Sequence, residues 1–529
     1  MAANSANNLT SDSQPVSIVW FKRDLRTGDH LPLLQAAQQG MLIPLYIVEP
    51  EFWKQPDADR CHYDFLCESL GELDRSLREI GGRLVIRVGN AVDIFRQLTD
   101  EFSIAKVYSH EETGNGWTFS RDRAVLKFLK AKGIPWQEER QFGVIRRLQS
   151  RNGWAARWTS FMRRPIGQVP RQVCVPGGLQ SLPLPKSETL GLGAAPAGPL
   201  QSGGESQGLA TLESFLTERG TDYRRAMSSP LSAEEACSRM SPYFAWGCVS
   251  IRTAWQRLQD RRSEVRNRLE EKAGVDPRWL GSLASYQSRL SWHCHFMQKL
   301  EDEPSLEFQN LNRAYDGLRE DEFNAERFAA WCAGRTGYPL VDACLRALHQ
   351  NRWINFRMRA MLMSFASYDL WLHWREPALH LARMFLDYEP GIHYPQAQMQ
   401  AGVTGINTIR IYSPTKQAQD QDPDGDFIRR HVPELAGCPL PYLHQPWLMS
   451  RDDQLRYGCW LGRDYPAPIV EHQAAAKLAQ QRIYAIRRSA AGVSEAATVM
   501  KKHGSRKRTA AKGRSRSSRS QSDGPRLFD

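Results

Sequence analysis

Alternation of short apolar runs with helical stretches in the first 145 residues constrains this chain more than any other feature. The runs with the composition of buried strands are residues 16–21, 41–48, 83–88, 105–108 and 134–138. The helical patterns between them cover residues 62–80, 91–101 and 120–131. Strands and helices at this spacing predict a doubly wound parallel sheet. No GxGxxG or GxxxxGK[ST] motif follows the first strand, so neither a Rossmann dinucleotide site nor a P-loop is predicted.

The rest of the chain changes character twice. Glycine and proline punctuate residues 163–208, which indicates a long linker between two domains. The helices predicted beyond it are 212–219, 242–260, 279–300, 321–332, 340–351, 353–374 and 377–386. The predicted fold class is therefore α/β plus all-α. Its parts are a disordered start (1–14), an α/β domain (15–145), a linker (146–208), a helical domain (209–490) and a basic disordered tail (491–529).

Most of the net charge of +12 lies in that tail, because residues 501–519 carry nine lysines and arginines and no acid. The remainder of the chain nets only about +3. A basic tail without an apolar period is expected to be disordered. It either holds a polyanion or serves as a solubilising extension.

Cysteine usage and hydropathy indicate the compartment. Ten cysteines are scattered without a CxxC pair, which favours reduced thiols over disulfides or a zinc site. We predict no metal site, and no spacing supports an iron–sulfur cluster. The chain contains no run of about 18 apolar residues, so no membrane span is predicted. Residues 1–14 lack the pattern of a secretory signal, so a cytoplasmic location is expected.

Polar groups interrupt the helical half in four places. Tyr223 is followed by residues 237–241 (CSRMS), directly before a helix expected from Pro242. Hydroxyls there either cap the helix or, with its free N–H groups, hold a phosphate. A second group, Arg289, Trp292, His293 and Phe296, shares one helix face after Tyr286. It suits a planar or anionic ligand, or else is an amphipathic helix with an arginine that reaches solvent.

The other two places lie further along the chain. In residues 353–359 (WINFRMR), the two arginines point about 200° apart, so one is expected to face inward. A buried arginine needs a carboxylate or phosphate partner. Residues 387–393 (DYEPGIH) put two carboxylates and a histidine on a loop. The loop could form a metal site, an acid/base pair or a single Asp–Arg structural pair.

Longer strings connect these places to one family. Residues 20–26 (WFKRDLR) resemble the opening of the photolyase/cryptochrome family, and residues 334–339 (GRTGYP) resemble its central signature. Matches continue at 374–375 (WR), 426–429 (DFIR) and 433–435 (PEL), so the resemblance runs from about residue 16 to 485. It implies an N-terminal α/β domain and a helical domain that binds FAD in a U shape and uses light to transfer electrons.

The resemblance also assigns roles by position. The residues that would hold FAD are Tyr223, Cys237, Ser238, Arg239, Met240, Ser241, Tyr286, Arg359, Asp387, Glu389 and His393. Arg359 and Asp387 would form an ion pair beside the isoalloxazine, where charge tunes a flavin. Cys237 stands where a Thr is usual, and Glu389 where a second Asp is usual. His393 lies where an Asn usually faces flavin N5, and its charge would bias which flavin radical persists.

The lesion pocket departs from the family pattern. The residues that would face DNA are Arg289, Trp292, His293, Asn355 and Arg357, with Trp292 stacking on a flipped pyrimidine pair. Arg289 occupies a position where lesion-repairing relatives carry Glu or Gln, so an acceptor has become a donor. His293 replaces an Arg, Phe356 an Asn and Ala360 a Met. Residues 353–359 hold no histidine, so the acid of (6-4) photoproduct chemistry is missing.

The electron relay is altered as well. Trp331 and Trp374 match the outer and middle members of the usual tryptophan chain, but the inner member aligns near Ala397. The candidates to replace it are Tyr388, Tyr394 and a rerouted Trp371. We therefore expect the relay and the flavin tuning to involve Trp331, Trp374, Tyr388, Tyr394 and His393. The alternative is that both tryptophans are core residues.

An antenna chromophore of the folate or deazaflavin type would bind at the strand ends of the first domain. Residues 20–26 and 109–115 lie there, and Glu111 or Glu112 would accept from a pterin or deazaflavin ring; an empty pocket is the alternative.

The predicted function is light-dependent repair of pyrimidine photoproducts by electron transfer from reduced FAD, a deoxyribodipyrimidine photo-lyase activity. Its partner would be DNA with UV photoproducts, and the protein would be a monomer. The first alternative is a cryptochrome-like blue-light receptor without repair activity. The second is a flavin oxidoreductase that does not use light, or a plain helical scaffold.

Overall fold

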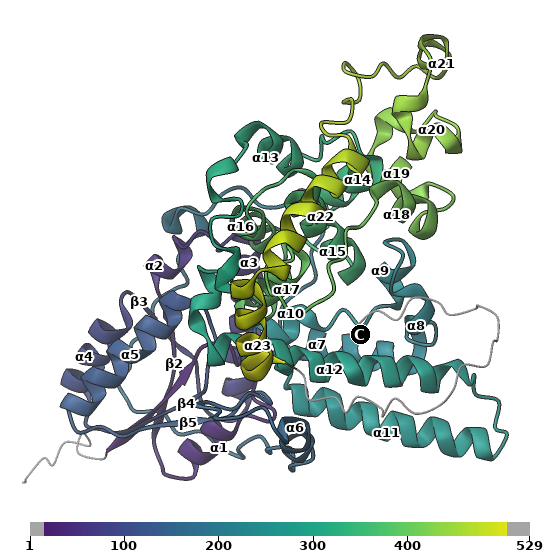
Figure 1. The fold of residues 1–529 in the computed structure, drawn as a ribbon. Coiled ribbons are helices and arrows are strands. Elements are labelled where there is room, and N and C mark those ends of the chain that lie inside the picture. The colour runs from purple at the N-terminus through teal and green to yellow at the C-terminus, as the bar shows by residue number, and fades with distance from the viewer. Residues whose placement is uncertain (1–14, 505–529) are drawn as a thin grey trace, which may run out of the picture.

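The computed structural model describes residues 15–504. The expected disordered start at 1–14 and the tail beyond residue 504 lie outside the described residues. The first domain contains a five-stranded parallel sheet in the order β3-β2-β1-β4-β5 (Figure 1). Its strands are β1 (Val16–Phe21), β2 (Leu42–Val48), β3 (Val85–Val88), β4 (Ile104–His110) and β5 (Trp136–Glu139).

Helices cover both faces of this sheet. They are α1 (Leu31–Ala37), α2 (Pro50–Trp53), α3 (Arg60–Glu79), α4 (Ala91–Glu101) and α5 (Gly116–Ala131). Val19 and Phe21 of β1 belong to the core shared with α1 and α3, whereas Ile18 and Trp20 belong to the core shared with α4 and α5. Because both faces are buried, β1 is apolar throughout. The predicted doubly wound sheet is confirmed.

The segment expected to be a linker, 146–208, is partly ordered into structure. It contains α6 (Trp154–Met162) and the turn η2 (Ser187–Leu190). Trp154, Trp158 and Phe161 of α6 are buried in the main core, so this helix is a packed element and not part of a linker. The remaining chain is fixed to the sheet domain by contacts such as the Ser181 hydroxyl, which accepts from the Ile86 amide at 2.9 Å.

The second domain is helical, as predicted, and lies beside the sheet domain in Figure 1. Its helices are α7 (Glu205–Ser214), α8 (Tyr223–Ala226), α9 (Ser232–Ala236), α10 (Ser241–Ala245), α11 (Ile251–Glu270), α12 (Arg278–Asp302), α13 (Ala325–Cys332), α14 (Pro339–Asn351), α15 (Phe356–Ser364), α16 (Arg375–Met384), α17 (Pro390–Gln400), α18 (Pro414–Gln421), α19 (Asp426–His431), α20 (Leu440–His444), α21 (Arg451–Tyr457), α22 (His472–Arg488) and α23 (Ala490–His503). Short turns are η3 (Phe215–Arg219), η4 (Pro304–Glu307), η5 (Arg313–Tyr315), η6 (Glu320–Glu322), η7 (Phe365–Asp369), η8 (Pro433–Leu435) and η9 (Pro446–Leu448).

Two predicted helices are shorter than expected. The helix expected over 242–260 is divided into α10 and α11, because Ser250 adopts an extended conformation and its side chain caps the Thr253 amide. The helix expected over 353–374 begins only at Phe356 and continues through the π-helical turn η7 to Asp369. Residues 353–355 instead form a non-helical entry to α15.

The disordered tail was expected to begin at residue 491, but the structure is helical there. Helix α23 occupies Ala490–His503, where disorder was expected to begin. Val499 packs with Leu300, Leu306 and Leu311, and the His503 ring lies 2.8 Å from a Glu303 oxygen. These contacts hold α23 against α12 and the segment that follows it. No helix among the described residues combines the length and apolar character needed to cross a bilayer.

Candidate functional site

A hollow of about 1290 Å³, open to solvent, lies between α12, α15, α17 and the loop before α10. The predicted site residues that line it are Tyr223, Cys237, Ser238, Arg239, Ser241, Tyr286, Arg289, Trp292, His293, Asn355, Arg357, Arg359, Asp387 and Glu389. Segments separated by up to 166 residues therefore converge on one space. Met240 is the exception in its segment, because its side chain is fully buried in the main core.

Two arginines fix the conformation of the loop before α10. Arg219 donates to the carbonyl oxygens of Cys237 and, at 2.8 Å, of Ser238. Arg239 has a positive φ of 58°, its Nε donates to Gln201 Oε1 at 2.9 Å, and its guanidinium lies 4.0 Å from the Trp353 ring centroid. No side chain caps α10, so the structure does not support simple capping as the role of the hydroxyls in this loop.

Arg359 and Asp387 meet at the wall of the hollow. Two parallel hydrogen bonds, Nη1 to Oδ1 at 2.9 Å and Nη2 to Oδ2 at 3.0 Å, join the side chains. Burial alone would raise the pKa of Asp387, but the Arg359 charge and its hydrogen bonds leave that pKa below its usual value. The contact is the ion pair that the resemblance implies. Arg359 comes from α15 and Asp387 from the loop before α17, so the pair joins two elements.

A second ion pair in the wall was missed by sequence reasoning. His293 Nε2 of α12 lies 2.9 Å from Glu389 Oε2, and the two side chains are only 9% and 6% exposed. Burial would lower the pKa of His293, but the Glu389 charge raises it to about 10. The imidazole is therefore an imidazolium at neutral pH. Nothing in the sequence indicates this pairing, because the resemblance assigns His293 to DNA and Glu389 to FAD.

The outer part of the hollow carries the residues assigned to DNA. Trp292 packs its ring against Phe296 at 5.6 Å, and an Arg289 nitrogen lies 3.9 Å from Met227 Sδ. Asn355 donates to the carbonyl oxygens of Met227 and Ser228, so its amide holds the loop after α8. Arg357 Nε is buried without a hydrogen-bond partner among residues 15–504.

A smaller hollow of about 550 Å³ shares part of this wall. His393 lines it, and His393 Nε2 lies 2.7 Å from the Ala378 carbonyl oxygen, which requires the proton on Nε2. Burial lowers the pKa of His393 to about 4, so the ring is neutral and leaves Nδ1 as an acceptor. Gln396 lines both hollows, and its buried Oε1 has no partner within the described chain. Sequence reasoning missed Gln396, although it lies one turn after His393.

Aromatic side chains lead away from the smaller hollow. Tyr388 lines it and lies 6.3 Å from Tyr394 between ring centroids, and Tyr394 lies 6.3 Å from Trp374. Trp331 is fully buried and packs on Phe328 and His380. Trp371, the rerouting candidate, instead lies between the guanidinium groups of Arg319 and Arg482.

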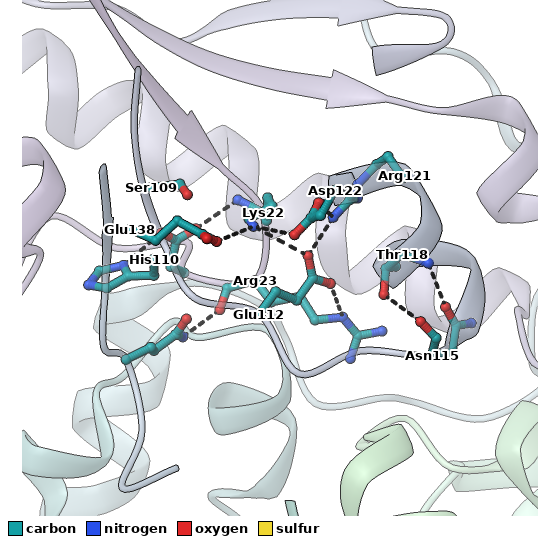
Figure 2. A network of polar contacts seen from close by, with 12 residues as sticks. Lys22, Arg23, Ser109, His110, Glu112, Asn115, Thr118, Arg121, Asp122 and Glu138 are labelled. Atoms are coloured by element: carbon teal, nitrogen blue, oxygen red, sulfur yellow. Dashed lines mark hydrogen bonds and ion pairs between the residues drawn. The ribbon is translucent and has the colours of Figure 1, made fainter. Parts of the chain in front are cut away.

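Charged side chains also gather at the strand ends of the sheet domain (Figure 2). Lys22 Nζ lies 2.9 Å from Asp122 and 3.8 Å from Glu112, and Arg121 lies 2.6 Å from Glu112. The adjacent hollow measures about 400 Å³. Glu112, proposed to accept from an antenna ring, is thus already engaged by three cations, Lys22, Arg23 and Arg121. Burial raises the pKa of Glu111 to about 7. The charge of Arg146 opposes this shift, and the charges of Glu138 and Glu301 add to it.

Asp24, His30 and His110 form the potential metal-ligand cluster found within residues 15–504. Asp24 Oδ2 lies 2.9 Å from His30 Nε2 and 2.8 Å from His110 Nδ1. His30 Nδ1 accepts from the Leu33 amide and so caps α1. These contacts use both ring nitrogens of His30 and the shared Asp24 oxygen, which favours a structural role at the strand ends.

Comparison with known proteins matches both domains. Residues 17–146 match the family model described as DNA photolyase, and residues 286–485 match the FAD binding domain of DNA photolyase. The chain is 30% identical over 488 residues to a deoxyribodipyrimidine photo-lyase of Streptomyces griseus, with 86% of this chain and 96% of that protein covered. It is 27% identical over 499 residues to cryptochrome-2 of Gallus gallus, with 88% and 82% covered.

A solved structure agrees with the whole architecture. A bacterial class III photolyase from Agrobacterium tumefaciens superposes with a TM-score of 0.77 and 27% identity, covering 92% of this chain and 100% of that one. The relatives at this level of identity include both photolyases and cryptochromes. The sheet domain, the helical domain and the matched segments lead to one conclusion: this chain belongs to the photolyase/cryptochrome family.

Proposed function

We propose that the large hollow holds FAD. Its walls offer hydroxyls from Ser238 and Ser241 with the Arg239 guanidinium for a pyrophosphate, and the Arg359–Asp387 pair for the ring system. Two buried polar atoms without partners in the described chain, Arg357 Nε and Gln396 Oε1, belong to residues that line the same space and fit a polar ligand. When bound and reduced, FAD supplies an electron under blue light.

The proposed activity is light-driven repair of pyrimidine photoproducts in DNA, and the positive charge of the hollow is the observation that supports it. Its lining contains four arginines and the His293 imidazolium, against only Asp387 and Glu389 among acids. The net charge of about +3 exceeds that of a pyrophosphate dianion. The excess lies where Arg289 and Arg357 border the outer part, so a second anion, such as a nucleic acid backbone, fits there. Trp292 offers a ring for stacking a flipped base.

A cryptochrome-like receptor without repair is the second candidate, and the lesion pocket favours it. Arg289 can only donate hydrogen bonds, whereas a thymine N–H needs an acceptor. Phe356 and Ala360 line the hollows with apolar surface at positions where a lesion would be held. Glu389, one of the two acids that line the large hollow, is paired with His293 at 2.9 Å.

A repair assay separates the two candidates. Purified full-length protein is first tested for bound FAD by its absorption spectrum, and then incubated with oligonucleotides carrying a cyclobutane dimer or a (6-4) photoproduct, in darkness and under blue light. We expect light-dependent loss of one lesion. FAD binding and photoreduction without any repair would favour the receptor. A protein that binds no FAD after refolding with the cofactor would refute both.

We further propose that the hollow of about 400 Å³ near Trp53 and Trp246 is where an antenna of the folate or deazaflavin type binds. An absorption band in addition to that of FAD, in protein purified under mild conditions, would support this. The ten free cysteines suit a reducing compartment such as the cytoplasm, and we propose that the protein acts there as a monomer.

A further inference from the structure

Tyr388 donates its phenolic hydrogen bond to a carboxylate of the other domain. Tyr388 Oη lies 2.6 Å from Asp57 Oδ2, and both side chains are buried. Asp57 lies in the loop between α2 and α3 of the sheet domain, 331 positions earlier in the chain. A phenol-to-carboxylate distance of 2.6 Å is typical of a strong, charge-assisted hydrogen bond.

The other partners of Asp57 are neutral. Asn115 Nδ2 donates to Asp57 Oδ2 at 3.1 Å, and Tyr394 Oη lies 3.4 Å from the same oxygen. Within residues 15–504, no lysine, arginine or histidine nitrogen lies within the 4.0 Å of an ion pair to Asp57. A buried carboxylate without a cation is costly. An asparagine at this position would keep the same hydrogen-bond acceptor without the charge, so purely structural needs do not explain an acid there.

The two tyrosines connect this carboxylate to the smaller hollow, which shares part of its wall with the hollow proposed for FAD. Tyr388 lines the smaller hollow together with His393, at 5.3 Å between the rings. Behind it, Tyr388 Oη and Tyr394 Oη lie 3.1 Å apart, and Tyr394 reaches Trp374. Burial and the negative charge of Asp57 raise the pKa of Tyr388 well above its usual value, so the phenol keeps its proton at rest.

We propose that Asp57 is the proton acceptor that allows Tyr388 to reduce a photoexcited flavin; this inference rests on the proposed function. One electron leaves the Tyr388 ring for photoexcited, oxidised FAD. The proton on Tyr388 Oη moves to Asp57 Oδ2, which leaves a neutral tyrosyl radical and a protonated carboxyl group. An electron from Trp374 through Tyr394, with return of the proton from Asp57, then restores Tyr388 and leaves the one-electron vacancy on Trp374, which an added thiol reductant fills. No charged phenol radical is formed in the dry interior, where it would be costly.

The test compares Asp57→Asn and Tyr388→Phe with matched controls in full-length, FAD-loaded protein. Glu307→Gln removes another buried carboxylate, one that accepts from the Gly116 amide and no phenol. Tyr63→Phe removes another buried phenol, one that donates to the Pro185 carbonyl oxygen. The measurements are the initial rate of flavin photoreduction in H₂O and D₂O, and the tyrosyl radical signal by transient absorption and electron paramagnetic resonance.

We expect Asp57→Asn and Tyr388→Phe to slow photoreduction about tenfold or more, which corresponds to about 1.4 kcal/mol in the barrier. Both should lose the neutral tyrosyl radical and the solvent isotope effect, while both controls keep them. Asp57→Glu should restore part of the rate, because it restores a base. Thermal unfolding of the flavin-free variants reports separately whether the fold is intact.

Two results would overturn the inference. One is a wild-type rate and isotope effect in folded, FAD-loaded Asp57→Asn. The other, which applies even if that variant does not fold, is a wild-type rate in Tyr388→Phe. Normal photoreduction without lesion repair would remove the repair proposal and leave this inference standing. A protein that binds no FAD would remove both.

Discussion

Replacing Glu389 with glutamine tests the buried ion pair that sequence reasoning did not find. Glu389 lies 2.9 Å from His293, and no other acid lines the hollow except Asp387, which is engaged by Arg359. In Glu389→Gln the imidazole loses the charge that keeps it protonated. Burial is then opposed only by the contact with Cys294, so the pKa of His293 should fall well below its value in the wild-type protein.

The size of the effect follows from the pKa of His293, about 10 in the folded protein against about 6.5 in an unfolded chain. A difference of about 3.5 units corresponds to about 5 kcal/mol at most, in line with the roughly 3–5 kcal/mol lost when one partner of a buried pair is removed. Because the folded pKa is the higher one, this stability is fully present below about pH 6.5 and is lost as the pH rises through about 10. Glu389→Gln should lack that pH dependence.

The assay is a titration of histidine Cε1–H signals by nuclear magnetic resonance, with His293 assigned from its missing signal in His293→Asn. Thermal unfolding at about pH 6.5 and about pH 10 provides the second measurement. Glu322→Gln is the matched control, because it breaks the exposed Arg482–Glu322 pair, worth about 1 kcal/mol or less. A wild-type His293 that titrates near 6.5, or a control as damaging as Glu389→Gln, would refute the reasoning.

Three further predictions concern the cofactor and the C-terminal helix. Arg359→Ala leaves Asp387 buried without its guanidinium, so FAD affinity, measured by fluorescence titration of flavin-free protein, should fall about tenfold or more; unchanged affinity would place the ring elsewhere. Because the pKa of His393 is about 4, the rate of photoreduction should not change with pH near 6.5 on account of this residue. An inflection near pH 6.5 that disappears in His393→Gln would contradict a neutral ring. Deleting α23 removes the packing of Val499 and the His503–Glu303 contact, so the melting temperature should fall by a few degrees, about 1–2 kcal/mol; an unchanged value would mean that α23 does not dock.

The sheet domain could be predicted because its signal is local. Each strand is buried on both faces, so each appears in the sequence as an unbroken apolar run such as residues 16–21. The convergence of Arg359 and Asp387 could also be predicted, but only through the family resemblance, since they belong to different elements 28 positions apart. Nothing in their local sequence identifies either as the other's partner.

Other features depend on contacts that no local pattern encodes. Helix α6 lies just before the stretch rich in glycine and proline, within the predicted linker 146–208, and it is stabilised by Trp154, Trp158 and Phe161 in the core. Helix α23 extends into the basic residues that predicted a disordered tail, and it is held by a few contacts with distant residues. Pairing of His293 with Glu389 required knowing that α12 and α17 pack side by side. In each case tertiary contacts override a local preference.

The sheet domain helps to position the two carboxylates of the hollow, although it contributes no residue to its lining. The chain that leads to Asp387 is held from that side, since His62 Nε2 lies 2.9 Å from the Phe385 carbonyl oxygen and Arg383 donates to the Pro56 carbonyl oxygen. Arg23 and Asp57 then contact Tyr388, between Asp387 and Glu389. Because Asp387, Tyr388 and Glu389 are consecutive residues, we expect a shift of the domain interface to change the positions of both acids and of the phenol between them. Under the proposed function, flavin tuning and electron supply would both depend on this one interface, so we expect the photochemistry to require both domains even without an antenna.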